Sequence, residues 1–138
     1  MASPAETIKS LFDTANVDEA GEWLLTVSRM PSSPDKVIAV YDAGGIAPNP
    51  QFKLDMPAVQ VRVRGAKNGY SEAYAKIQDC VNAILGLPSQ DIGGDRWVSV
   101  AMRGYIQPIG YDESERPELT ANFSLIIEPS ASSYREAL

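Results

Sequence analysis

The chain has 138 residues, of which 22% are charged and 44% hydrophobic, with a formal net charge of −6 and no histidine. This length suits a single domain, 1–138, whose one hydrophobic core needs no metal or disulfide. The acidic balance argues against a surface built to grip nucleic acid, and the lack of histidine excludes Ser-His and Cys-His catalysis. Carboxylate-only chemistry and a magnesium site stay open, but both need clustered acids that the sequence does not indicate.

The single cysteine indicates the redox state of the compartment in which the protein folds. Cys80 lies on the apolar side of a predicted helix, so a small buried hydrophobe is favoured over a reactive thiol, and a disulfide framework is impossible. We therefore expect a reducing compartment. The chain has no run of about 18 apolar residues and no basic-then-apolar N-terminus. We expect neither a membrane span nor a signal peptide, and a soluble protein that is intracellular at synthesis.

The first segment predicts a short helix. Ser3, Pro4 and Glu6 have the types and spacing of a capping box that starts at Ser3. The apolar residues that follow recur at helical spacing and give the helix one apolar face: Ile8, Leu11, Phe12 and Ala15. We expect the helix to end near Asn16, before an acidic loop.

Two strands and a loop are predicted next. Residues 22–30 alternate in a way that predicts a strand, and two prolines, Pro31 and Pro34, place a turn after it. Residues 37–41 are apolar at every position, which is typical of a central strand covered on both faces. Residues 42–50 are rich in Gly and Pro and predict a long loop that turns a corner or touches a partner.

Residues 57–87 are the segment around which the fold is organised. Residues 57–65 alternate as a half-buried strand does, with Val59, Val61 and Val63 on one face and Gln60, Arg62 and Arg64 on the other. Apolar residues at spacings of three and four then predict a helix that covers the valine face: Tyr70, Ala73, Tyr74, Ile77, Cys80, Val81, Ile84 and Leu85. We expect Glu72 and Lys76 to form an ion pair on its exposed side.

Two more strands complete the pattern. Residues 89–95 predict a polar link, and residues 96–106 and 119–127 alternate as strands do. Residues 107–117, between these two strands, contain Pro, Gly and several charged residues, which predicts an exposed loop. Residues 130–138 are short and polar, and we expect a flexible tail there.

This order of elements predicts an α+β fold. We expect a two-layer sandwich, in which a mixed, mainly antiparallel sheet of about five strands has two helices packed on one face. The other face of the sheet then has only partial cover. We expect part of it to meet a partner subunit.

Three motifs could bind ions, and for each a structural role is favoured. Gly44 and Gly45 are followed by neither a Walker-type sequence nor a helix, so a turn is favoured over a phosphate loop. Arg62 and Arg64 could contact phosphate, but pairing with acids on neighbouring strands is favoured in an acidic chain. The acidic loop around Asp112 could hold a cation, but internal pairing in a solvated loop is favoured. We predict no catalytic residue, metal or cofactor.

Five ordered segments, spanning about residues 30–128, are distinctive together. They are residues 30–31 (MP) with 34–35 (PD), 37–45 (VIAVYDAGG), 57–65 (PAVQVRVRG), Tyr70 with 73–74 (AY), and 110–113 (GYDE) with Arg116 and 122–123 (NF). As a set they resemble the minor capsid, or tail terminator, proteins of long-tailed bacteriophages. Two places depart from that pattern: Tyr111 stands where a basic residue is expected, and residues 114–115 where a tighter glycine turn is expected.

The resemblance implies a structural virion protein and not an enzyme. It implies a homohexameric ring that caps the tail tube, stops its polymerisation and joins it to the head-neck connector protein. Such a protein is made in the host cytoplasm, resides in the tail or neck of the virion and contacts no membrane. Genomic DNA passes through its lumen without specific binding. The alternatives are a neck or head-completion protein of the same virion region, and a small ligand-binding or carboxylate-dependent enzyme domain.

The same interpretation predicts contacts to neighbouring subunits or partner proteins. The residues lie in the central strands and in two long loops, 42–55 and 107–117: Tyr41, Asp42, Gly44, Gly45, Arg62, Arg64, Asp112, Arg116 and Asn122. On this hypothesis, reversing the charge of Asp112 or Arg116 weakens assembly. The stability of the monomer should then change by no more than about 0.5 kcal/mol, as is usual for surface substitutions.

Overall fold

The computed structural model of the protein describes residues 2–49 and 51–130. Within these residues the chain forms two helices, α1 (Pro4–Thr14) and α2 (Tyr70–Leu85), and seven strands. The strands are β1 (Leu24–Val27), β2 (Val37–Asn49), β3 (Leu54–Arg64), β4 (Gln90–Ile92), β5 (Asp95–Met102), β6 (Gln107–Tyr111) and β7 (Pro117–Glu128). The predicted α+β class is confirmed. The predicted tail, apart from Ser130, lies outside the described residues.

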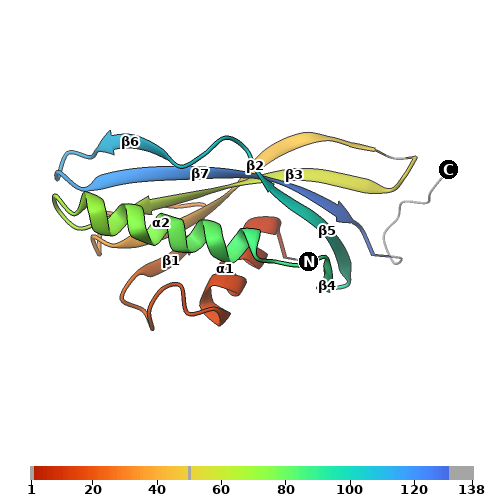
Figure 1. Ribbon diagram of the computed structural model, residues 1–138, viewed down its shortest axis with the longest axis horizontal. Helices are drawn as coiled ribbons and strands as arrows, with labels where there is room; N and C mark the ends of the chain where they lie inside the picture. The colour runs from red at the N-terminus through yellow and green to blue at the C-terminus, as the bar shows by residue number, and fades with distance from the viewer. Residues whose placement is uncertain (1, 50, 131–138) are drawn as a thin grey trace.

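The strands form one mixed sheet that curls into a half-barrel (Figure 1). Its order is β1-β2-β3-β7-β5-β4, with β6 also paired to β7; β1 and β2 are parallel and all other pairs are antiparallel. The mainly antiparallel character is as predicted. The expected number of about five strands is wrong, because β4 and β6 fall in segments assigned to loops. The sheet is also curled, which the expected two-layer sandwich did not include.

The long loop predicted at residues 42–50 is mostly strand. β2 continues to Asn49 and pairs with β3 from Leu54 onward, with register shifts after Asp42 and after Ile46. The glycines and prolines of this segment therefore belong to an irregular, bulged hairpin rather than to a loop. β6 likewise lies in a segment that was predicted as a loop, and its pairing with β7 is irregular, with a register shift between Pro108 and Gly110.

The core forms where both helices meet one face of the sheet. The valine face of β3 and the apolar stripe of α2 are buried together, as predicted. Cys80 is fully buried, and this burial raises the pKa of its thiol, so its role as a small hydrophobe is confirmed. All four residues from Val37 to Val40 are buried, which confirms a strand covered on both faces. The largest fully buried side chains include Trp23, Phe12 and Phe123.

Two local predictions for the helices had opposite outcomes. The capping box is confirmed, because Ser3 Oγ accepts from the Glu6 backbone N at 3.2 Å and Ser3 N donates to Glu6 Oε1 at 2.8 Å. The ion pair between Glu72 and Lys76 is wrong. Lys76 is buried, and its Nζ donates to the Val17 carbonyl at 2.7 Å, while Glu72 pairs with a different lysine. Lys76 thus ties the loop after α1 to α2.

Candidate assembly surfaces

The nine residues predicted to contact partners lie in three places and do not form one site. Tyr41, Arg62 and Asn122 lie on the outer face of the sheet, which is the face turned away from the helices. Asp42, Gly44 and Gly45 lie where the β2–β3 hairpin leaves the body of the sheet. Arg64, Asp112 and Arg116 surround the turn between β6 and β7.

The outer face carries an arginine without an acidic partner. Gln60 Nε2 donates to Asn122 Oδ1 at 3.1 Å, across β3 and β7. The guanidinium of Arg62 lies over the ring of Tyr41, 5.5 Å from its centroid, in a cation–π contact. Its Nε is buried and has no hydrogen-bond partner among the residues that the structure describes. The predicted pairing of Arg62 with an acid is therefore wrong.

Arg64 is buried within the subunit and holds a loop. Its Nε donates to the Asp35 carbonyl at 3.0 Å, and its Nη2 donates to the Pro34 carbonyl at 2.6 Å. Burial, followed by repulsion from Arg116, lowers the pKa of Arg64. Arg64 thus uses backbone carbonyls in place of the expected acids, and it fixes residues 31–36 to the sheet.

Asp112 and Arg116 close the turn between β6 and β7. Asp112 Oδ1 accepts from the backbone N of Ser114 and of Arg116, each at 2.9 Å, and Oδ2 accepts from Arg116 Nε at 2.7 Å. Arg116 Nη1 also donates to the Ser32 carbonyl at 2.7 Å and to Asp35 Oδ1 at 3.2 Å. The internal pairing predicted here is confirmed. Because Arg116 is only 8% exposed, reversing its charge is not the surface change assumed above, and we now expect it to lower the stability of the monomer.

The β2–β3 hairpin begins at a glycine bulge beside α1. Asp42 Oδ1 accepts from the Ala5 backbone N at 2.9 Å, which puts a carboxylate at the positive end of α1. Gly44 and Gly45 have φ of 77° and 102°, and the register shifts between Asp42 and Gly45. These glycines form a bulge in a strand instead of the predicted turn. We call residues 42–49 and 51–57 the hairpin arm.

Asp42 should contribute to the stability of the fold. We expect Asp42→Ala to lower the free energy of unfolding by about 1 kcal/mol, the typical loss when a side-chain cap is removed. The reason is that Ala5 N–H loses its side-chain acceptor and the helix loses a favourable charge. Urea unfolding measures the change. Asp42→Asn keeps an acceptor and should lose less, whereas a fully stable Asp42→Ala variant would contradict this role.

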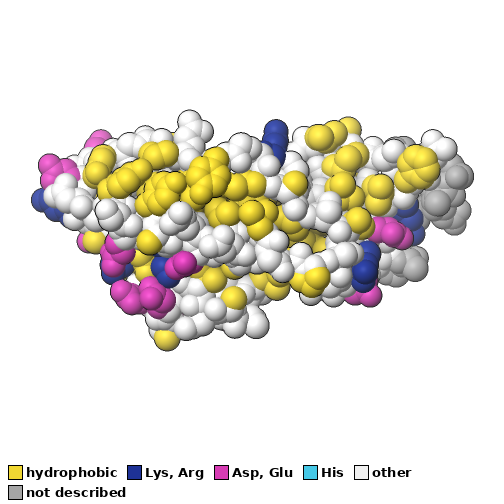
Figure 2. Space-filling model, viewed as in Figure 1, with side chains coloured by type: hydrophobic (Ala, Val, Ile, Leu, Met, Phe, Trp, Pro, Cys, Tyr) yellow, Lys and Arg dark blue, Asp and Glu magenta, His cyan; other side chains and the backbone are white. Residues whose placement is uncertain are grey.

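An exposed apolar surface beside α2 was missed by the sequence prediction. Tyr70 and Tyr74 of α2 have ring centroids 6.0 Å apart, and burial together with the neighbouring Tyr105 raises the pKa of Tyr74. Ile109 and Tyr111 of β6 are also exposed. Figure 2 shows apolar side chains gathered along α2 and β6. We call these five residues the tyrosine patch; the sequence placed its two α2 members on the helix face that covers the valines of β3.

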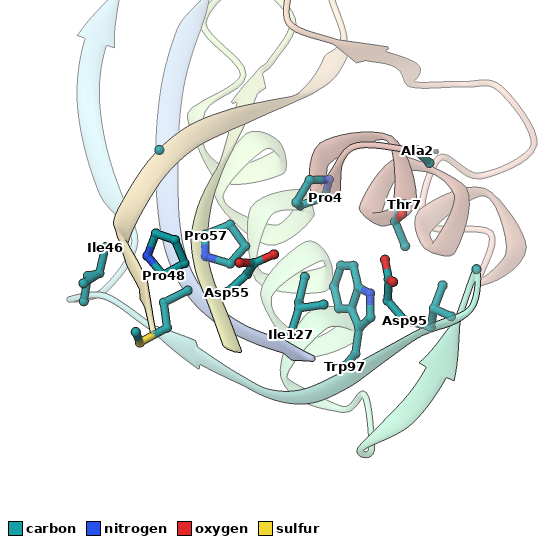
Figure 3. Close-up of a pocket in the computed structure, with 14 residues that line it drawn as sticks. Ala2, Pro4, Thr7, Ile46, Pro48, Asp55, Pro57, Asp95, Trp97 and Ile127 are labelled. Atoms are coloured by element: carbon teal, nitrogen blue, oxygen red, sulfur yellow. The ribbon is translucent and has the colours of Figure 1, made fainter. Parts of the chain in front are cut away.

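A pocket of about 340 Å³ opens under the hairpin arm. Figure 3 shows that its side chains come from α1 (Pro4, Thr7), β3 (Asp55) and β5 (Asp95, Trp97) and converge on one space. Among residues 2–49 and 51–130, no three His, Cys, Asp or Glu side chains are grouped as a metal site. The pocket is a hollow at the end of the half-barrel, lined by both apolar and acidic side chains.

The sequence between α1 and the end of β7 matches a known family. Residues 9–129 match the model of a family described as bacteriophage tail terminator protein. The chain belongs to this family. The match includes all seven described strands and α2, so the resemblance carried by the five segments is confirmed over the whole sheet.

A solved virion structure contains a chain with a similar fold. It comes from the "Virion of native gene transfer agent (GTA) particle", with a TM-score of 0.63 and 13% identity, over 88% of the tail terminator and 91% of that chain. A likeness at this identity supports the fold. The comparison with curated protein sequences found no match to this chain. No helix within the described part of the chain is long and apolar enough to cross a membrane.

Family membership indicates a structural tail protein of a virion, which is a non-enzymatic role. The tail terminator departs from the expected glycine turn at residues 114–115. There Glu115 takes a φ of 61°, and the bonds of Asp112 close the turn without glycine. The partner contacts of all nine residues predicted from the sequence stay predictions.

Proposed function

We propose that this tail terminator forms a homohexameric ring that caps the tail tube once the tube has reached its proper length. The ring stops tube polymerisation and joins the tube to the head-neck connector. The observation that carries the proposal is the family match over residues 9–129. The subunit is made in the host cytoplasm and remains in the virion, where the tail meets the neck.

The surfaces of the subunit support assembly. The tyrosine patch and the hairpin arm leave large apolar side chains in solvent, and contiguous surfaces of this kind mark protein–protein interaction sites. The outer face carries Arg62 stacked over Tyr41, with Asn122 on the neighbouring strand β7, and we expect this face to contact a neighbour. The other predicted contact residues hold the arm and the turn in place: Asp42, Gly44, Gly45, Arg64, Asp112 and Arg116.

The charge of the subunit supports a conduit for DNA. Each copy contributes a formal charge of −6, so a ring concentrates negative charge on its rims and lumen wall. Like charges repel a phosphate backbone, and this repulsion weakens non-specific binding. Genomic DNA therefore passes through the lumen without specific binding.

The proposal is tested with purified tail tube protein. Adding the tail terminator to polymerising tubes should stop their growth, and negative-stain images should show a ring at one end of each tube. Light scattering should give the mass of a ring, and duplex DNA should stay unbound at physiological salt.

Three results would contradict this function. A strict monomer with and without tube protein would remove the ring, and tight, salt-sensitive DNA binding would remove the passive conduit. Binding to portal-side rings in preference to tubes would indicate a neck or head-completion protein.

A further inference from the structure

Two exposed apolar surfaces lie at opposite ends of the molecule. The hairpin arm is at one end of the long axis, and the turn between β6 and β7 is at the other (Figure 1). On the arm, Ile46 is 66% exposed and Phe52 is 62% exposed. On the tyrosine patch, Tyr105 is 63% exposed and Tyr111 is 56% exposed. Figure 2 shows apolar side chains along α2 and β6 in the half that contains the β6–β7 turn, and a second group in the half that contains the hairpin arm. Large side chains in solvent at two separate ends indicate two contact surfaces.

Both ends also have strand edges that lack a neighbour. β1 covers the outer edge of β2 only as far as Val40, so within the described residues the rest of β2 has β3 as its one partner strand. β6 pairs with β7 alone, and all five of its residues are exposed. The two free edges lie on opposite sides of the sheet order. Backbone groups on free edges favour pairing with another chain.

The two ends carry opposite charges that are not used within the subunit. Lys53 lies in the turn of the hairpin arm, next to Phe52, and Glu113 lies in the turn that follows Tyr111. Neither forms an ion pair with a residue in the described ranges. The cation is thus beside one apolar surface and the anion beside the other, which is the arrangement expected of complementary halves.

We propose that the hairpin arm of one subunit lies on the tyrosine patch of the next copy of this chain. Phe52 and Ile46 pack among Tyr105, Ile109 and Tyr111, and Lys53 faces Glu113. The inference rests on the proposed function, because it names the contact that joins neighbours in the ring. The two surfaces differ, so the contact is heterologous: each subunit gives one arm and one patch, and repetition gives the proposed ring when the rotation between neighbours closes. Exposed Phe and Tyr side chains are suited to such a contact, since aromatic residues dominate interface energetics.

The test uses two variants that each block one surface. Phe52→Asp blocks the arm and Tyr111→Asp blocks the patch, and both positions are exposed, so each subunit should fold with nearly unchanged stability. Each variant alone should fail to form rings. Mixed in equal amounts, they should form a heterodimer and nothing larger, because one intact arm meets one intact patch and no further surface is left. Mass photometry measures the species, and circular dichroism checks the fold.

Leu85→Asp is the matched control, since Leu85 is exposed on α2 but belongs to neither surface; it should form rings like the wild type. Rings formed by Phe52→Asp or Tyr111→Asp alone would overturn the inference and leave the ring intact. A mixture without heterodimers, or with larger assemblies, would also overturn it. A wild-type protein that stays monomeric even with tube protein would instead overturn the proposed function, and this contact with it.

Discussion

Arg116→Ala is expected to lower the free energy of unfolding by about 3 kcal/mol, the size of loss seen when one partner of a buried ion pair is removed. The substitution removes the Arg116 Nε that donates to Asp112 and the Nη1 that donates to Ser32 and Asp35. The turn between β6 and β7 then loses these bonds to residues 31–36. Urea unfolding followed by circular dichroism gives the change from the midpoint at constant slope.

Arg96→Ala is the control for this prediction. Arg96 and Asp91 form an ion pair at 3.4 Å in which both side chains are exposed, so its loss should cost less than about 1 kcal/mol. Equal losses for the two arginines would contradict a special role for Arg116.

The dependence of stability on pH provides a second check. Burial raises the pKa of Asp112, but hydrogen bonds from Arg116 and Ser114 lower it more, so the pKa lies below its usual value. The turn thus contributes stability above the unfolded pKa, and that stability is lost as the pH falls through the folded pKa.

Gly45→Ala should cost about 3 kcal/mol or more, because backbone strain and overpacking act together. A Cβ at this position would lie 2.3 Å from the Met56 carbonyl oxygen and 2.7 Å from the Ala58 N. Both atoms belong to the backbone of β3, so β2 would have to move away from β3 at the base of the hairpin arm. Thermal unfolding, together with the ring assay, measures the change.

Gly44→Ala is the matched control. Gly44 also has a positive φ, but a Cβ there meets nothing within 4 Å, so only the backbone penalty of about 1–2 kcal/mol applies. The difference between the neighbouring glycines isolates the clash with β3. If both variants were equally stable, the packing of Gly45 against the β3 backbone would have to be looser than the structure indicates.

The parts of the fold that follow from local periodicity were predictable. The alternation of valines in β3 and the spacing of apolar residues in α2 gave the central strand, its helix and the core face. The capping box gave the start of α1. The strands that were missed, β4 and β6, are short, and β6 is exposed at every residue, so no burial pattern reveals it.

The partners of charged side chains were less predictable, because they are distant in sequence. Arg116 donates to a carbonyl 84 residues away, and Lys76 to one 59 residues away, and neither separation leaves a local signal. The spacing of Glu72 and Lys76 suggested an ion pair, but burial of Lys76 against Val17 prevails. The exposure of the tyrosines on α2 could not be predicted either, because helical spacing does not distinguish an apolar core face from an apolar outer surface.

The position of β7 has a consequence for synthesis of the chain. β7 pairs with β3 along one edge and with β5 and β6 along the other, yet it is the last described strand to leave the ribosome. Until it emerges, β3 has β2 on one edge but no neighbour on the other, and β5 and β6 lack the strand with which both pair, so a nascent chain cannot complete its core. Such non-local pairing slows folding, since distant segments must meet before their contacts stabilise them. Completion of the core is therefore expected to wait until β7 has left the ribosome and paired with β3, β5 and β6.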